Sequence, residues 1–238
     1  MIEGARVFVI VPAFREARRI GSVLRTMPAS VDRVIVVDDG SDDATADVAR
    51  TCGDERLTVI RHERNRGVGA AIATGYRVAL EQPGGPRDAF VVMAGDGQMD
   101  PDDLPALVGP VARGEAGYAK GTRVGDSAHI PVARYLGGRV MTALTCMALG
   151  LGVTDSQCGY TAISRQACAT LDLGAVWHGF GYPNDLLAKL SASGVSLAEV
   201  PVQAVYTARR NKLRAWHVPV IAFVIARSLA KRLRATTW

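Results

Sequence analysis

The first half of the chain alternates short apolar runs, rich in β-branched residues, with longer stretches of helical periodicity. The apolar runs cover residues 7–11, 33–37, 57–60 and 89–94, and the helical stretches cover 17–26, 45–52 and 69–80. Runs of that length are typical of buried strands, and helices between them connect parallel neighbours. The pattern predicts an α/β fold with a mostly parallel, Rossmann-like sheet and helices on both faces. In such a sheet the carboxyl ends of the strands share one edge, where ligands bind.

The second half of the chain is less regular. We expect strands at 118–123 and 197–202 and helices at 132–150, 183–193 and 217–234. The length of 238 residues fits a single domain, and an apolar share of 48% is that of a globular protein.

The composition argues against several classes of protein. The N-terminus lacks the basic residues that precede the apolar run of a secretory signal, and no stretch approaches the roughly 18 uninterrupted apolar residues of a membrane span. The four cysteines are scattered without a C-x-x-C pair, which indicates reduced thiols rather than disulfides or a zinc site. We therefore expect a cytoplasmic protein.

Positive charge is concentrated near the C-terminus. No Asp or Glu follows Glu199, and eight of the 28 Lys and Arg residues lie after it. Over 217–234 the apolar residues follow helical spacing, while Arg227, Lys231 and Arg234 share another face. Such a helix can pack on the core or lie on an anionic membrane, and the spacing fits both. Peripheral contact at the inner membrane face is thus one expectation; no nucleic-acid partner is expected, and the oligomeric state stays open.

Two acidic segments follow predicted strands. In the first, Asp38 and Asp39 end a strand, and Gly40 permits the turn into the next helix. Carboxylates at that edge can accept hydrogen bonds from a base or from ribose hydroxyls. The alternative is a capped turn whose charges are simply solvated.

In the second segment, an apolar strand runs into Asp96, and Gln98 follows two residues later. These are hard oxygen ligands of the kind that Mg²⁺ or Mn²⁺ prefers when it bridges a diphosphate. Asp100 and Pro101 instead look like the N-cap and first residue of the next helix. We therefore assign metal binding to Asp96 rather than to Asp100.

These segments occur in a fixed order with residues 11–16, 65–71, 120–123 and 155–160. The ordered set resembles the family-2 glycosyltransferases, which have the GT-A fold. The likeness is greatest to the polyprenyl-phosphate branch, similar to dolichol-phosphate mannose synthase. The resemblance covers about residues 6–215 and implies a GT-A domain, whose bounds we set at 1–215. From their spacing and charge we expect residues 216–238 to form a basic amphipathic helix packed on or beside it.

The resemblance also implies roles for individual residues. Asp96 and Gln98 would bind Mg²⁺ or Mn²⁺, and Asp185 matches the acidic position that the wider family uses as catalytic base. We count Asp96 and Asp185 as catalytic. The donor nucleotide would be held by Pro12, Ala13, Phe14, Glu16, Asp38, Asp39, Ala94, Gly95, Asp96, Arg123 and Lys212.

The chain departs from the family pattern at the metal motif. That motif is usually Asp-x-Asp, and here Ala94 stands in place of the first acid. Metal binding then depends on Asp96, Gln98, the diphosphate and water. Mg²⁺ accepts such a set because it keeps several of its waters.

We predict a glycosyltransferase that uses a nucleoside-diphosphate sugar as donor, and the resemblance implies that it inverts the anomeric configuration. Charge on the leaving phosphate would be stabilised by the metal and by Lys120, Arg123 and Lys212. The acceptor is a polyprenyl phosphate or a small hydroxylated molecule. A hydroxyl acceptor needs a base, for which Asp185 is the one acid we nominate, whereas a phosphate is already ionised.

Two alternatives compete with this prediction. A nucleotidyltransferase would carry a glycine-rich signature after the first strand, where residues 14–16 read Phe-Arg-Glu, and is disfavoured. A catalytically silent sugar-nucleotide binding module is suggested by Ala94.

Overall fold

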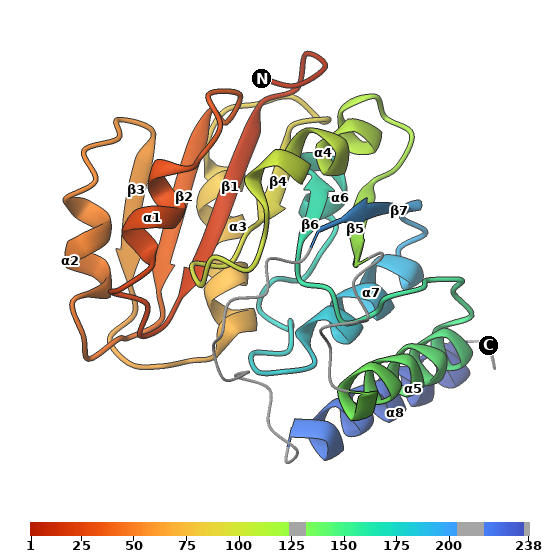
Figure 1. The fold of residues 1–238 in the computed structure, drawn as a ribbon. Helices are drawn as coiled ribbons and strands as arrows, with labels where there is room; N and C mark the ends of the chain where they lie inside the picture. Colours follow the sequence, from red (N-terminus) through yellow and green to blue (C-terminus); the bar gives the residue numbers. More distant parts are fainter. Residues whose placement is uncertain (124–131, 204–216, 236–238) are drawn as a thin grey trace.

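The structure is a computed structural model, and it describes residues 1–123, 132–203 and 217–235 (Figure 1). One sheet organises these residues. Its strands are β1 (Val7–Ala13), β2 (Arg33–Asp38), β3 (Leu57–Arg61), β4 (Ala89–Val92), β5 (Tyr118–Arg123), β6 (Thr161–Ser164) and β7 (Leu197–Val202). They lie in the order β3-β2-β1-β4-β6-β5-β7. β6 is antiparallel to both of its neighbours, and every other pairing is parallel. The predicted mostly parallel sheet is confirmed.

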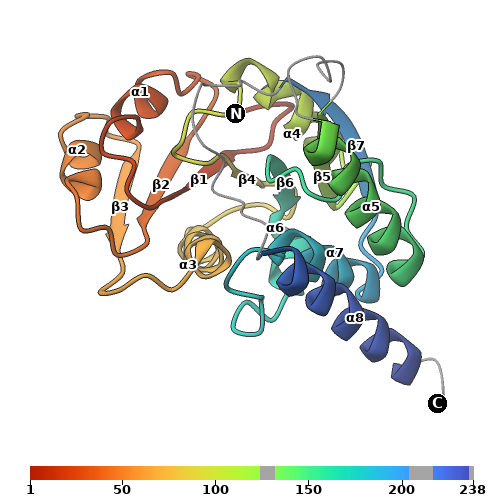
Figure 2. The same ribbon diagram turned by 60° about the horizontal axis from the view of Figure 1, so that its bottom comes forward.

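Helices cover both faces of the sheet, as predicted. They are α1 (Ile20–Arg25), α2 (Thr45–Arg50), α3 (Val68–Glu81), α4 (Leu104–Ala112), α5 (Val132–Leu149), α6 (Arg165–Ala169), α7 (Tyr182–Ala192) and α8 (His217–Ala235), with a 3-10 turn η1 (Pro101–Asp103) before α4. Figure 2 shows α1, α2 and α4 on one face, and α3, α6 and α7 on the other. The chain is therefore a three-layer α/β structure.

Both faces of the central strand β1 are buried, which explains its uninterrupted apolar sequence. Val7, Val9 and Val11 join the core beneath α1 and α4, whereas Phe8 and Ile10 join the core beneath α3 and α7. Successive side chains of a strand point to opposite faces, so a strand covered on both sides must be apolar throughout.

The sequence pattern did not predict β6. This strand has only four residues and begins and ends with the hydroxyl side chains of Thr161 and Ser164, so it contains no apolar run. It forms because all four residues are buried between β4 and β5. Its tertiary surroundings, rather than its own periodicity, define it.

The C-terminal helix α8 packs against α5 and α7. Its residues Ile221 and Ile225 are buried in the core on the α3 side of the sheet. The predicted boundary near residue 215 lies outside the described residues. Within the described part of the chain, no helix combines the length and the apolar character that crossing a bilayer demands.

A prediction concerns Gly75, where α3 crosses β1. A Cβ at this position would lie 2.3 Å from Cγ2 of Ile10, so the close approach of helix and strand requires glycine. We expect Gly75→Ala to destabilise the protein by about 1–3 kcal/mol through overpacking, although alanine is the better helix former.

The matched control is Gly137→Ala in α5, where no described atom lies within 4 Å of the added Cβ. Here helix propensity alone acts, and we expect stabilisation of about 0.5–1 kcal/mol. Urea unfolding of both variants measures the two effects. Equal effects of the same sign would contradict the packing of α3 on β1.

Candidate functional site

The carboxyl ends of the parallel strands meet at one edge of the sheet. Ala13 of β1 lies opposite Asp38 of β2, and Val92 at the end of β4 lies opposite Ile10. Thr161, the first residue of β6, pairs with Val92 and also with β5. The segments that follow β1, β2 and β4 therefore converge with the end of β5 and the segment before β6.

Backbone contacts fix the loop after β4 against the end of β1. The amide of Gly95 donates to the carbonyl of Pro12 at 3.1 Å. A Cβ on Gly95 would lie 3.3 Å from Cβ of Ala13 and 3.0 Å from Cδ1 of Ile20. This close approach favours glycine at position 95, directly before Asp96. The predicted donor residues Pro12, Ala13, Ala94 and Gly95 are thus brought together.

Asp96 follows that contact and is half-buried. Its Oδ1 accepts a hydrogen bond from the amide of Gln98 at 3.2 Å, and no ion pair to Asp96 is found among the described residues. A carboxylate with unused lone pairs beside a side-chain amide suits Mg²⁺ or Mn²⁺. Within residues 1–123, 132–203 and 217–235 no group of three or more His, Cys, Asp or Glu side chains could hold a metal. The fit is therefore to an ion that keeps several ligands from a diphosphate and water.

Asp38 is fully buried at the end of β2. Its Oδ1 accepts hydrogen bonds from the amide and the hydroxyl of Ser41, and its Oδ2 lies 3.4 Å from Nε of Arg61. Oδ2 itself has no hydrogen-bond partner within the described structure. Asp38 therefore shapes the turn into α2, and its second oxygen faces the Arg61 guanidinium.

Asp39 holds the segment that leads into α3. Its Oδ1 accepts from Nδ1 of His62 at 2.7 Å and from the amide of Arg66 at 2.9 Å, and its Oδ2 accepts from the amide of Gly67 at 2.7 Å. The side chain is only 3% exposed. In this arrangement most of the capacity of Asp39 as an acceptor is used by the chain itself.

The loop after β1 is anchored to the turn after β2. Arg15 has a positive φ of 56° and forms a bidentate ion pair with Asp42, and its guanidinium lies over the ring of Phe14. The Glu16 carboxylate is buried and pairs with Arg19 at 3.4 Å. Of the two predicted donor residues in this loop, Phe14 and Glu16, Phe14 has the more exposed side chain.

Arg123 ends β5 and binds Asp155 through two hydrogen bonds of 2.7 and 2.9 Å. Burial raises the pKa of the Asp155 carboxyl, but the hydrogen bonds and charge of Arg123 outweigh this and lower the pKa overall. Asp155 Oδ1 also accepts from the amides of Gln157 and Cys158, both at 3.1 Å. Arg123 thus fixes the segment before β6 at the same edge as Asp96.

Lys120 also binds the segment before β6. Its side chain is fully buried, and Nζ donates to the carbonyl of Cys158 at 2.6 Å. Burial lowers the pKa of this ammonium group. The cation that the sequence suggested for the leaving phosphate therefore holds the backbone of the segment before β6.

Asp185 lies in the first turn of α7 and is 2% exposed. Its Oδ1 accepts from Arg227 of α8 at 2.7 Å, while Oδ2 lies 3.0 Å from Nζ of Lys189 and accepts from the amide of Trp177 at 2.9 Å. The Arg227 guanidinium also stacks over the Trp177 ring. As arranged, this carboxylate joins α7, α8 and the segment before α7.

The segment before α7 reaches the start of α3. The carbonyl of His178 accepts from the amide of Gly69 at 2.6 Å. A Cβ on Gly67 or Gly69 would meet the carbonyl of His178 or Trp177, which explains both glycines. The cluster around Asp185 is thereby connected to the segment that Asp39 holds.

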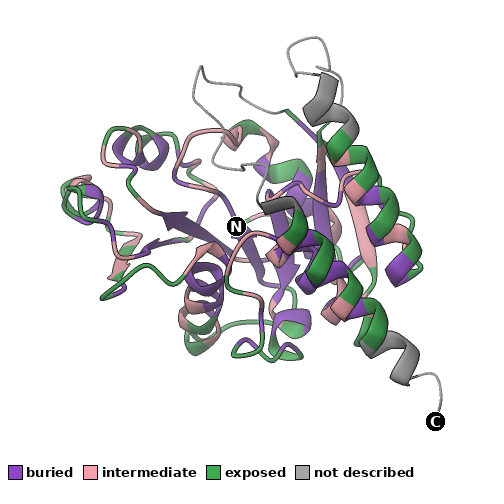
Figure 3. Ribbon diagram, turned by 90° about the horizontal axis from the view of Figure 1, so that it is seen from below, coloured by how far each residue is buried: buried purple, intermediate pink, exposed green. Residues whose placement is uncertain are grey.

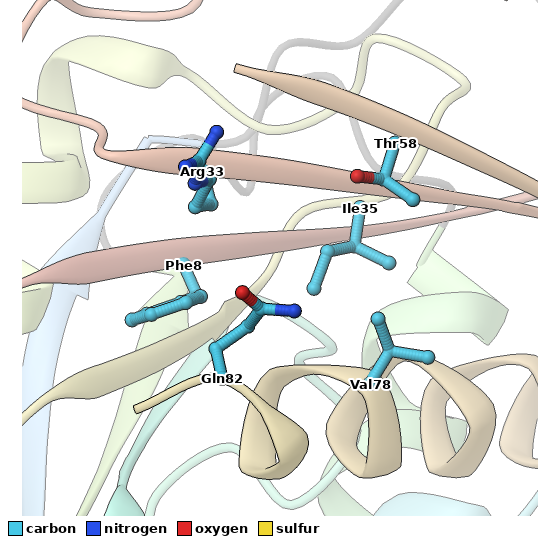
Figure 4. A pocket seen from close by; sticks show the side chains of 6 residues that line it. All are labelled: Phe8, Arg33, Ile35, Thr58, Val78 and Gln82. Atoms are coloured by element: carbon cyan, nitrogen blue, oxygen red, sulfur yellow. The ribbon is translucent and has the colours of Figure 1, made fainter. Parts of the chain in front are cut away.

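One predicted residue has no described position, and one hollow lies away from this edge. Lys212 falls among residues 204–216, outside the described part of the chain. A hollow between α3 and the sheet is lined by Phe8, Arg33, Ile35, Thr58, Val78 and Gln82 (Figure 4). Because Arg33 begins β2 and Gln82 follows α3, that hollow is toward the amino ends of the strands and is not part of the site.

Sequence reasoning missed two partners of the predicted residues. Asp155 is the counter-ion of Arg123, and Arg61 is the counter-ion of Asp38. Asp155 belongs to one of the ordered motifs, which was a usable signal. Arg61 carried none, because its pairing depends on the register of β3 with β2.

Comparisons with known proteins agree with this geometry. The model of the family described as glycosyl transferase family 2 matches residues 8–171. The chain is 30% identical over 205 residues to an undecaprenyl-phosphate mannosyltransferase of Micrococcus luteus, covering 83% of this chain and 82% of the relative. It is 27% identical over 219 residues to the UDP-N-acetylglucosamine–dolichyl-phosphate N-acetylglucosaminyltransferase of Methanococcus voltae, covering 84% and 86%.

A solved structure has the same fold. The glucosyl-3-phosphoglycerate synthase of Mycobacterium tuberculosis, in complex with Mn²⁺, UDP-glucose and phosphoglyceric acid, aligns with a TM-score of 0.73 and 22% identity over 95% of this chain and 80% of that one. The fold is therefore that of the GT-A glycosyltransferases. With the family model covering more than half of its length, this chain belongs to glycosyl transferase family 2.

Proposed function

We propose that the chain is an inverting glycosyltransferase that transfers a sugar from a nucleoside-diphosphate sugar to a polyprenyl phosphate. The observation that carries the proposal is Asp96, a half-buried carboxylate without an ion pair in the described structure, fixed at the carboxyl edge by the contact of Gly95 with β1. The relatives named as undecaprenyl-phosphate and dolichyl-phosphate transferases support the acceptor class.

The nucleoside of the donor would lie over the ends of β1 and β2. Pro12, Ala13 and Phe14 offer a backbone and a ring there, and Asp38 supports the turn after β2 through its hydrogen bonds from Ser41. Asp39 contributes by holding the segment that begins α3, which closes one side of this region.

The diphosphate would lie beside the loop after β4. Asp96 and Gln98 would hold Mg²⁺ or Mn²⁺, which when bound supplies positive charge to the leaving phosphate. Arg123 and the basic residues of the C-terminal third, Lys212 among them, would add further positive charge. The Mn²⁺ that accompanies UDP-glucose in the M. tuberculosis structure supports a divalent ion.

A phosphate acceptor matches the state of Asp185. A hydroxyl acceptor must lose its proton to a base, and this carboxylate is buried with Arg227, Lys189 and the Trp177 amide around it. An ionised phosphate oxygen can attack the anomeric carbon directly. The new C–O bond forms as the bond to the nucleoside diphosphate breaks and its electron pair leaves with that phosphate, which inverts the anomeric configuration. We therefore propose that Asp185 is a positioning residue.

The acceptor class also bears on location. We propose that the reaction takes place at the cytoplasmic face of a membrane, where a polyprenyl phosphate presents its headgroup. The four free cysteines are in keeping with a reducing compartment.

One prediction tests the metal residue. Asp96→Asn keeps the shape of the side chain but removes its charge, so we expect sugar transfer to fall by at least about 100-fold. Transfer of labelled sugar to a short-chain polyprenyl phosphate in the presence of Mn²⁺, across a panel of nucleotide sugars, measures it.

Asp100→Asn is the matched control. It removes the same charge four residues away, while the amide oxygen can still cap η1 as the carboxylate does now. We expect transfer within about twofold of the original. If both variants were equally active, Asp96 would have no part in the reaction and the proposed function would fail.

A second prediction separates a positioning role of Asp185 from a role as base. Asp185→Asn leaves Arg227 and Lys189 without their counter-ion, so we expect it to lower the free energy of unfolding by about 3 kcal/mol. At a temperature where the variant is folded, transfer to a polyprenyl phosphate should keep the shape of its pH profile.

Lys189→Met serves as control because it alters the same ion pair but keeps the carboxylate. If Asp185 were a general base, Asp185→Asn would abolish the pH dependence of transfer and slow transfer by at least about 100-fold, whereas Lys189→Met would do neither. That result would favour a hydroxyl acceptor.

A further inference from the structure

The helices α5 and α8 expose many apolar side chains. They pack against each other, and their exposed apolar residues are Val140, Ala143, Leu144 and Met147 of α5 and Pro219, Ala222, Phe223, Ala226, Leu229 and Ala230 of α8. We call these ten residues the apolar face. Met147 is 71% exposed and Phe223 58% exposed. Apart from Met1, every large exposed hydrophobic side chain of the described residues belongs to this face.

The spacing of the apolar face is helical, so it is a continuous stripe on each helix. Residues 140, 143, 144 and 147 follow the i, i+3, i+4, i+7 pattern, as do 219, 222, 223 and 226. The hydroxyl residues Thr142, Thr145 and Ser228 are buried instead. A surface helix ordinarily turns its polar side to solvent, so the apolar residues on the outer side of these helices indicate that something covers that face.

The charge of the two helices limits what can cover that face. The sequences of α5 and α8 contain Arg134, Arg139, Arg227, Lys231, Arg232 and Arg234 and no Asp or Glu. A second copy of the chain, docked through the same face, would bring one pair of basic helices against another. An anionic lipid surface instead takes up apolar side chains and attracts helices of net positive charge.

The apolar face lies on the side of the molecule that carries the site. Figure 3 looks onto the carboxyl edge of the sheet, and α5 and α8 run beside each other there with exposed stretches along their length. Arg227 of α8 is bound to Asp185, and the Phe223 ring lies 6.2 Å from that of Trp177. A surface resting on the two helices would therefore be next to the segment that contacts the start of α3.

We propose that α5 and α8 together dock on an anionic bilayer, with the apolar face inserted at the level of the headgroups. The docking itself does not depend on the chemistry of the site. Its use, which is to present the headgroup of a polyprenyl phosphate to the carboxyl edge, rests on the proposed function.

Vesicle co-sedimentation of the full chain tests the docking. We expect association with mixed phosphatidylcholine–phosphatidylglycerol vesicles, weaker association with phosphatidylcholine alone, and a decline as salt is raised. Phe223→Ser and Met147→Ser should each weaken association by about tenfold, because each removes an apolar side chain from the inserted face. Both residues are exposed, so the variants should fold normally, which circular dichroism checks.

A matched pair tests the charge. Arg139→Gln removes an exposed cation beside the apolar face, and Arg25→Gln removes an exposed cation from α1 on the other side of the sheet. We expect only the first to weaken association with the anionic vesicles. Sugar-nucleotide binding without lipid, measured by thermal shift, should be unchanged in all four variants and so reports on the proposed function separately.

Two results would overturn the docking. One is an absence of vesicle association, or association that Phe223→Ser and Met147→Ser leave intact, while sugar-nucleotide binding persists. The other is a dimer in sedimentation velocity without lipid that the same two substitutions dissociate, since a second copy would then cover the apolar face. If the unsubstituted protein did not bind any sugar nucleotide, that result would count against the proposed function and not against the docking.

Discussion

The parallel pairing of β1 with β4 determines where the chain presents Asp96, an acid without an ion pair among the described residues. The pairing carries the chain past Val92 to Gly95, whose amide binds the Pro12 carbonyl and whose missing side chain lets the loop approach Ala13. Asp96 then leaves the sheet at the carboxyl edge. A side chain on Gly95 or a shift in register would move that carboxylate away from the end of β1, and with it the site that we propose for a metal-bound diphosphate.

Most other acids near the site are occupied in building it. Asp39 binds the segment before α3, Asp155 binds Arg123, and Asp185 joins α7 to α8. Each is buried or nearly so, where a charge is tolerated only with partners. These pairs hold the loops of the edge in place, so that Asp96 can remain open to a ligand. The same network reaches α8, and through it the apolar face that we propose to rest on lipid.

The sequence predicted the fold well because periodicity and motif order are local signals. It placed the first four strands, the helices between them, and the acids after β2 and β4. It missed β6, whose four residues form a strand only because β4 and β5 enclose them. It also treated Lys120 as a cation for the donor, because no local pattern revealed that this side chain is buried against the Cys158 carbonyl. Ion-pair partners such as Arg61 depend on strand register, which no motif encodes.

The central claim is that Asp96 binds a nucleoside diphosphate through a divalent ion. Isothermal titration of UDP, GDP and dTDP into the full chain, with Mn²⁺ and then with EDTA, measures this most directly. The account predicts that at least one of the three binds when Mn²⁺ is present and that chelation abolishes its binding. Equal binding in EDTA, or no binding by any of the three with Mn²⁺ present, would contradict it.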